Sequence, residues 1–192
     1  MNILSLAENI RARARGNGAM GFLYRHSSHL VTICYMAGNL ILLVKQGLDF
    51  NLEALAGCLL MAQALAAWNI NKNPLFLKLA GGLNVLGGFA LAISAWGQAG
   101  FISQAIGALP LIGSGLMMLR GSADRAGNAS GSFLRKYPVV AAGMLQVMFR
   151  PFLLYSGLQC GDPGLVLASL FWAAGDLALA ASDRNLRLAI EA

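Results

Sequence analysis

Long apolar runs alternate with short polar breaks along most of the chain. Each run has about 17–21 residues, enough for a helix to cross a hydrocarbon layer of ~30 Å at ~1.5 Å per residue. The runs lie at residues 29–45, 52–68, 76–96, 101–120, 138–157 and 163–181. The pattern therefore predicts an all-α, polytopic membrane bundle with about six transmembrane helices.

The breaks contain residues that favour turns. Residues 45–49, 69–74, 96–100 and 161–164 each contain Gly or Pro, and residues 121–132 form a Gly/Ser-rich linker. When Gly47, Gly97 and Gly157 are aligned, the helices fall into three hairpins of one orientation. This alignment predicts a pseudo-threefold repeat about an axis along the membrane normal.

The N-terminal segment has a different pattern. Ile3, Leu6 and Ile10 share one helical face, and Arg11 and Arg15 lie on the opposite side. We expect an amphipathic helix on the inner leaflet, either as a topology anchor or as a contact for lipid or a partner. The predicted organisation is an N-terminal cytoplasmic segment (1–28), a six-helix transmembrane domain (29–182) and a cytoplasmic tail (183–192).

Composition supports lipid as the solvent. Hydrophobic residues make up 57% of the chain and charged residues 11%, whereas soluble domains have about 25% charged residues. The net charge of +6 and the isoelectric point near 9.7 could indicate nucleic-acid binding. The placement of the basic residues gives a different explanation.

Most basic residues fall on one side of the predicted topology. Apart from Lys45 on the other side and Arg150 inside a run, they lie in the N-terminal segment, the second and fourth loops and the C-terminal tail. Cytoplasmic loops are enriched in Lys and Arg. We therefore expect both termini in the cytoplasm, no nucleic-acid partner, and a bacterial inner membrane as the location.

Each predicted span contains a polar side chain at depth, which should face the bundle interior because lipid offers no hydrogen-bond partner. The candidate substrate-binding residues are Asn39, Gln63, Asn84, Gln104, Gln146, Arg150 and Asp176. Gly81, Asn84 and Gly88 share one face of the third span, which favours close helix packing with a hydrogen bond from the amide.

Arg150 and Asp176 are the most informative of these residues. An unpaired charge at mid-span costs at least ~2.5–3.5 kcal/mol, so we expect an ion pair between the fifth and sixth spans. Gln146 lies one turn from Arg150 and can join the pair. The pair has two interpretations: a structural latch, or a site in which Arg150 binds an anion and Asp176 relays a proton.

Motifs for other functions are missing from the sequence. It contains no Walker loop, dinucleotide fingerprint, H-E-x-x-H or G-x-S-x-G. His26 and His29 are expected to be solvated residues at the membrane edge rather than metal ligands. We therefore expect no enzyme activity, no cofactor and no metal.

Two functions fit these expectations. The first is a small permease or channel-like protein that moves a small solute or ion through a polar site at mid-membrane. The second is a non-catalytic subunit or scaffold of a larger membrane complex. Membrane lipid is the expected partner in both cases, together with other membrane proteins or further copies of the chain.

Overall fold

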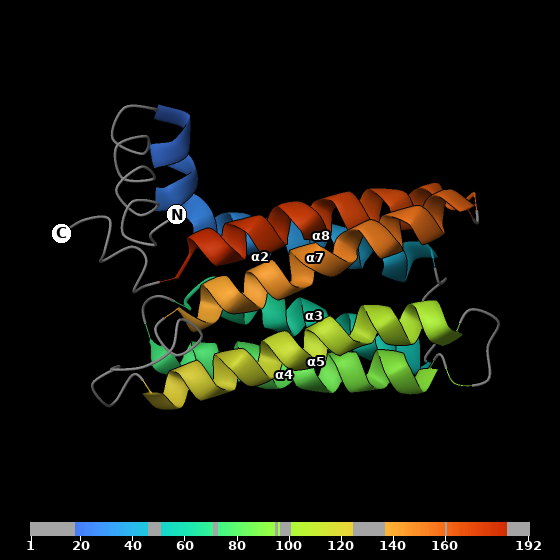
Figure 1. The fold of residues 1–192 in the computed structure, drawn as a ribbon, viewed down its shortest axis with the longest axis horizontal. Helices are drawn as coiled ribbons and strands as arrows, with labels where there is room; N and C mark the ends of the chain where they lie inside the picture. The colour runs from blue at the N-terminus through green and yellow to red at the C-terminus, as the bar shows by residue number, and fades with distance from the viewer. Residues whose placement is uncertain are drawn as a thin grey trace, which may run out of the picture.

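The structure is a computed structural model that describes residues 18–45, 51–70, 73–94, 96, 101–124, 137–159 and 161–183. Within these residues the chain forms six α-helices and no strand (Figure 1). The helices are α2 (Gly18–Lys45), α3 (Leu52–Ala67), α4 (Pro74–Ser94), α5 (Phe101–Asp124), α7 (Pro138–Gln159) and α8 (Pro163–Ala181).

The helices follow the predicted apolar runs closely, and the range of α8 is identical to its run. The largest difference is in α2, which begins at Gly18 instead of residue 29. Residues 1–17, which include most of the predicted amphipathic segment, lie outside the described residues. The all-helical class is therefore confirmed for the described part of the chain.

Among the described residues, four helices are long and apolar enough to cross a membrane. These segments are His26–Lys45, Pro74–Ser94, Pro138–Gln159 and Pro163–Ala181. The apolar parts of the other two helices, Ala54–Ala67 and Ala105–Gly121, are shorter. The fold is compatible with a multi-pass membrane protein, while the six crossings, the three-hairpin arrangement and the repeat remain predictions.

Side-chain caps fix the starts of three helices. Asn51 Oδ1 accepts a hydrogen bond from the backbone N–H of Ala54 at 2.8 Å, and Asn73 Oδ1 accepts one from Leu75 at 2.9 Å. Asp162 caps α8. Gly161, just before this cap, has a φ of 61°, which favours glycine. The turn residues that interrupt the apolar pattern thus satisfy backbone donors that a helix leaves free.

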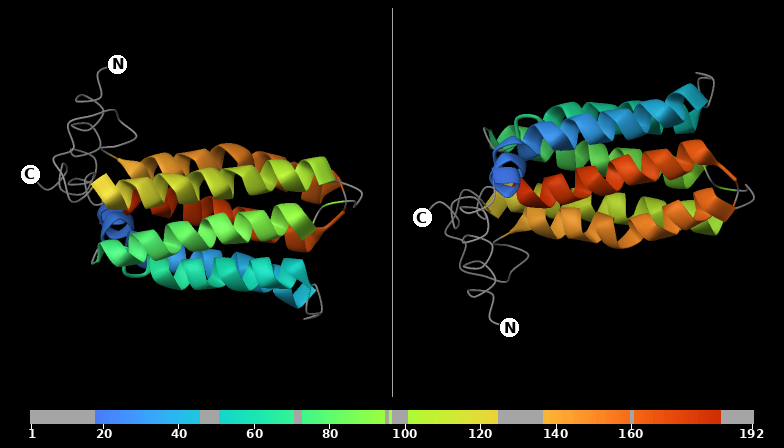
Figure 2. Two further views of the ribbon diagram at one scale, coloured as in Figure 1. Left: turned by 90° about the horizontal axis from the view of Figure 1, so that it is seen from below. Right: turned by 90° about the horizontal axis from the view of Figure 1, so that it is seen from above.

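The six helices form two layers. One layer contains α2, α7 and α8, and the other contains α3, α4 and α5 (Figures 1 and 2). Each helix packs against the next one along the chain, and α8 packs against α2. The main helix contacts therefore form a closed ring, and side chains from all six helices can meet inside it.

Glycines bring α4 and α5 into backbone contact. A Cβ atom at Gly81 would lie 2.8 Å from the carbonyl oxygen of Gly115, and a Cβ at Gly115 would lie 2.5 Å from that of Gly81. A Cβ at Gly88 would lie 2.7 Å from Ile112 Cγ1 and 3.2 Å from the carbonyl oxygen of Ala108. The small-residue face predicted around Asn84 is therefore a helix-packing face.

The distribution of polarity is the reverse of that in a soluble protein. Large apolar side chains are exposed on every helix, for example Val44 at 67% and Leu109 at 64%. Polar and charged side chains such as Asn84, Gln146 and Asp176 are buried. Soluble monomers rarely expose contiguous apolar surfaces of this kind, so the exterior fits lipid contact.

Candidate functional site

The ion pair predicted between Arg150 and Asp176 forms at the centre of the helix ring. Arg150 on α7 donates from Nε to Asp176 Oδ2 on α8 at 2.6 Å, and from Nη2 to Oδ1 at 3.2 Å. The Asp176 side chain is fully buried and that of Arg150 is 10% exposed. Two parallel hydrogen bonds give this pair a fixed geometry and offset part of the cost of burying the charges.

Tyr35 on α2 provides a third hydrogen bond to the carboxylate. Its hydroxyl donates to Asp176 Oδ1 at 2.6 Å and lies 3.2 Å from Gln146 Oε1. Gln146 Oε1 also accepts a hydrogen bond from Arg150 Nη2 at 3.3 Å. The predicted participation of Gln146 is therefore confirmed as a contact, and the pair is joined to α2 as well as to α7 and α8.

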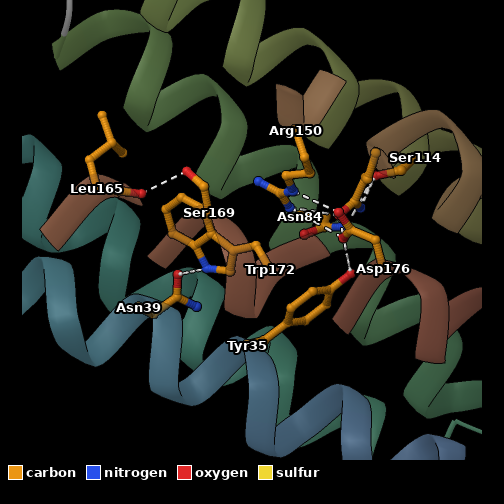
Figure 3. A network of polar contacts seen from close by, with 10 residues as sticks. Tyr35, Asn39, Asn84, Ser114, Arg150, Leu165, Ser169, Trp172 and Asp176 are labelled. Carbon is orange, nitrogen blue, oxygen red and sulfur yellow. Dashed lines mark hydrogen bonds and ion pairs between the residues drawn. The ribbon is translucent and has the colours of Figure 1, made fainter. Parts of the chain in front are cut away.

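The second layer joins the pair through Ser114 on α5. Gln146 donates from Nε2 to Ser114 Oγ at 2.6 Å, and Asn84 on α4 donates to the same oxygen at 3.3 Å. Ser114 in turn donates to the carbonyl of Leu111 at 3.0 Å. We call the six residues Tyr35, Asn84, Ser114, Gln146, Arg150 and Asp176 the central network. Figure 3 labels all of them except Gln146.

Trp172 flanks the central network on α8. The guanidinium carbon of Arg150 lies 5.0 Å from the centroid of the Trp172 ring, which is a cation–π distance. Trp172 donates from Nε1 to Asn39 Oδ1 on α2 at 3.1 Å (Figure 3). Asn39 is therefore connected to the site through the indole of Trp172.

Two glycines make room for the aromatic rings between α2 and α8. A Cβ atom at Gly38 would lie 2.6 Å from Trp172 Nε1, and a Cβ at Gly175 would lie 2.5 Å from the ring of Tyr35. The ring of Trp172 thus packs over Gly38 of α2, and the ring of Tyr35 packs over Gly175 of α8. This reciprocal packing fixes the hydroxyl of Tyr35 and the indole of Trp172 beside the charged pair.

The structure brings together four of the seven predicted site residues: Asn84, Gln146, Arg150 and Asp176. Asn39 joins them through Trp172. Gln63 on α3 is buried, and its Nε2 has no hydrogen-bond partner among the described residues. The side chain of Gln104 lies outside the described part of the structure. A role in substrate binding remains a prediction for all seven residues.

Sequence reasoning missed Tyr35 and Trp172. Both are aromatic residues within apolar runs, and the sequence analysis assigned them no function. Helical spacing could have identified them, because Tyr35 lies four residues before Asn39 and Trp172 four residues before Asp176. Residues four apart share a helix face, so an aromatic residue with a polar atom at that spacing is a candidate for the same buried network.

A third missed residue is Asp183, just after the end of α8. Its Oδ2 accepts hydrogen bonds from the backbone N–H groups of Val139 at 2.9 Å and Val140 at 3.2 Å. A carboxylate at this position satisfies free donors and complements the positive end of the α7 dipole. Asp183 therefore links the end of α8 to the start of α7, away from the central network.

An exposed ion pair lies at the opposite end of α8. Lys45, at the end of α2, bonds to Asp162 Oδ2, and Asp162 Oδ1 accepts from the N–H of Leu165 at 3.1 Å. The hydrogen bond from Lys45 is the main cause that holds the pKa of Asp162 below its ordinary value. This pair joins α2 to α8 outside the buried site.

The described residues contain no group of three or more His, Cys, Asp or Glu side chains that could hold a metal ion. Chemically, the site offers one permanent cation, one carboxylate and neutral hydrogen-bonding groups. Such a set can bind a charged solute by exchange with the internal ion pair, or can hold five helices together.

An apolar exterior around a buried ion pair is compatible with a multi-pass membrane protein. No protein-family model matches the chain, and no curated protein or solved structure matches it. The central network is therefore the main structural feature on which a function can be based.

Proposed function

We propose that the chain is a small integral membrane permease that moves a small solute or ion through the central network. In this proposal it crosses a bacterial inner membrane six times as three hairpins, with both termini in the cytoplasm. The basic residues of the N-terminal segment, the even loops and the C-terminal tail support this orientation.

The observation that carries the proposal is the buried Arg150–Asp176 pair at the meeting point of five helices. Charged residues inside membrane domains are costly and often mark substrate or ion pathways. The pair is connected to α2, α4 and α5 by neutral side chains that can change hydrogen-bond partners. A solute that displaced one member of the pair would therefore change contacts in both layers.

Flux into proteoliposomes tests the proposal. Purified protein is reconstituted, and uptake of labelled anions, cations and small neutral solutes is compared with that of empty vesicles. Arg150→Gln and Asp176→Asn should each abolish uptake while helix content and monodispersity are retained. Lys45→Gln, which removes an exposed charge at the bundle edge, serves as the matched control. Normal uptake by both network variants would show that the proposed site is wrong.

A membrane subunit without transport activity is the second candidate. The observation that favours it is that both oxygens of Asp176 and the Nε and Nη2 of Arg150 are hydrogen-bonded inside the bundle, as expected of a structural latch. Native mass spectrometry of the protein purified from its host in mild detergent separates the candidates. Stoichiometric co-purification with other membrane proteins, and assembly preserved when Arg150 and Asp176 are exchanged, would favour the subunit.

A further inference from the structure

A small cavity lies between α5 and α7 beside the central network. Its volume is about 10 Å³, which is about the space of a single water or a monatomic ion. Arg150 and Gln146 are its two polar lining residues, and apolar residues such as Pro110, Phe149 and Leu153 form the other walls. This volume has room for one small ion or molecule, and Arg150 and Gln146 are the polar side chains that such a ligand would contact.

Arg150 has one nitrogen left for such a ligand. Its Nε and Nη2 face Asp176 and Gln146, and no hydrogen bond in the described structure involves Nη1. Because the carboxylate binds the Nε/Nη2 edge side-on, Nη1 lies on the opposite edge of the guanidinium. Arginine stays protonated in proteins, so Nη1 carries two charged N–H donors and no acceptor.

The amide of Gln146 is already in use. Its Nε2 donates to Ser114, and its Oε1 accepts from Arg150. A buried water usually needs two to four polar partners, and the apolar walls offer a water no further acceptor side chain. A monatomic anion needs only donors, and it gains from the positive charge of Arg150. The lining side chains thus favour an anion over any cation.

Charge balance then links the anion to a proton. Arg150 and Asp176 together have no net charge, so an added anion alone would leave one uncompensated negative charge in a medium of low dielectric constant. Protonation of Asp176 restores neutrality. Among the described residues, the other titratable groups near this carboxylate are Arg150 on α7 and Tyr35 on α2, and the Cβ of Cys34 lies 3.3 Å from where a Cβ at Gly175 would be.

From this geometry we infer that the cavity binds one small monovalent anion of halide size at Nη1 of Arg150, together with one proton on Asp176. No covalent bond between heavy atoms changes. The inference rests on the same site as the proposed function, and it specifies the substrate class: if the protein is a permease, it moves an anion and a proton in the same direction. Binding can be measured separately from transport.

The first experiment measures thermal unfolding of the detergent-purified protein in sodium chloride against sodium gluconate at equal ionic strength. Chloride should raise the midpoint saturably at pH 5 and less at pH 8. Where binding takes up one proton, the apparent chloride dissociation constant should increase about tenfold per pH unit. Fluoride should act similarly, bromide should act more weakly because it is larger than the cavity favours, and sulfate should have no effect. No chloride effect at either pH, or equal effects at both, would overturn the inference.

Charge variants identify the two partners. Arg150→Gln should lose the chloride effect, and Lys45→Gln should keep it. Asp176→Asn leaves Arg150 without its counterion, so chloride should stabilise this variant at both pH values. Equal stabilisation of Arg150→Gln and the unmodified protein would show that chloride acts elsewhere. If Asp176→Asn does not fold, the pH dependence of the unmodified protein still decides the question.

A pair of glycine variants tests the cavity itself. Gly107 lines it, and a Cβ there would lie 3.0 Å from Leu153 Cδ2. Gly113, on the same helix, would place a Cβ 2.9 Å from Leu145 Cδ2 but does not line the cavity. Gly107→Ala should weaken chloride binding at least about tenfold, and Gly113→Ala should leave it unchanged. Equal effects of the two variants would contradict the assignment.

The binding and flux results separate the two proposals. Chloride binding that follows this pattern without any flux would support the anion site and exclude the permease. Flux of another solute through a protein that does not bind halides would support the permease and exclude the anion site.

Discussion

The α2–α8 interface and the α4–α5 interface use glycine for opposite purposes. Between α4 and α5, Gly81 and Gly115 let two backbones touch. Between α2 and α8, Gly38 and Gly175 each admit an aromatic ring from the other helix. One interface therefore depends on close backbone packing, and the other on rings that carry hydrogen-bonding groups to the ion pair.

The difference extends to the two layers of the bundle. The layer of α2, α7 and α8 contains both charged residues of the central network, whereas the layer of α3, α4 and α5 contributes neutral groups such as Asn84 and Ser114. The 2.6 Å hydrogen bond from Gln146 to Ser114 joins them. Any conformational change centred on the ion pair should begin in the layer of α2, α7 and α8, because the hydrogen bonds there are between side chains that can change partners.

The largest expected effect comes from leaving one charge unpaired in the first layer. Asp176→Leu should destabilise the protein by about 3–5 kcal/mol, because Arg150 would stay buried without a counterion. The double variant Arg150→Met/Asp176→Leu should recover most of that loss. Reversible unfolding in mixed micelles measures both. A double variant as unstable as the single one would mean that packing, rather than charge, dominates this layer.

The stability of the layer of α3, α4 and α5 should depend on side-chain volume rather than on charge. Gly81→Ala places a methyl group against the Gly115 backbone and should cost about 1–3 kcal/mol, as is typical of overpacking. Gly82→Ala, on the adjacent position where a Cβ would meet nothing within 4 Å, is the matched control and should be nearly neutral. The same unfolding assay compares them. Similar stabilities of the two variants would show that the α4–α5 contact is loose.

A smaller effect is expected from Tyr35→Phe, which keeps the ring above Gly175 and removes only the hydroxyl. Asp176 retains its two hydrogen bonds to Arg150, so the loss should be about 1 kcal/mol. Tyr155→Phe removes the hydroxyl of a tyrosine that is 61% exposed and should change stability little. A cost for Tyr35→Phe as large as that for Asp176→Leu would make the hydroxyl, rather than Arg150, the main partner of the carboxylate.

The sequence was sufficient to predict the helices and the ion pair. Apolar runs bounded by Gly, Pro and Asn define α3, α4, α7 and α8 almost residue by residue, since both lipid and a bundle core select the same apolar pattern. Arg150 and Asp176 could be paired because an isolated charge in lipid is too costly.

The sequence could not specify which neutral groups complete the site. Asn84 and Gln63 look alike in the sequence, yet only Asn84 joins the central network, because the rotation of each helix is set by contacts with distant segments. Tyr35 and Trp172 were missed for a related reason. Helical spacing marks both as candidates, but their positions in the site depend on Gly175 and Gly38 of the facing helix, and no local pattern shows which glycine lies opposite which ring.

The smallest expected effect concerns the Lys45–Asp162 ion pair at the exposed end of the α2–α8 interface. It tests whether this pair contributes to the stability of the fold in addition to the buried part of the interface. Asp162 keeps its charge to lower pH when folded, because Lys45 lowers its pKa. The stability from this ion pair is thus fully present above the unfolded pKa of ~3.9 and is lost as the pH falls through the lower folded value. The Lys45 side chain is 53% exposed, so solvent screening should limit the contribution to below about 1 kcal/mol.

Asp162→Asn removes the ion pair and the attraction of the carboxylate to the α8 dipole, while asparagine can still cap α8 at Leu165. The unmodified protein should be slightly more stable than the variant at pH 6, and the difference should decrease as the pH falls below ~4 and vanish below the folded pKa. Added salt should reduce the difference at pH 6 as well. A difference that persisted in acid would come from the cap rather than the charge, and the α2–α8 interface would then depend on its buried rings and ion pair alone.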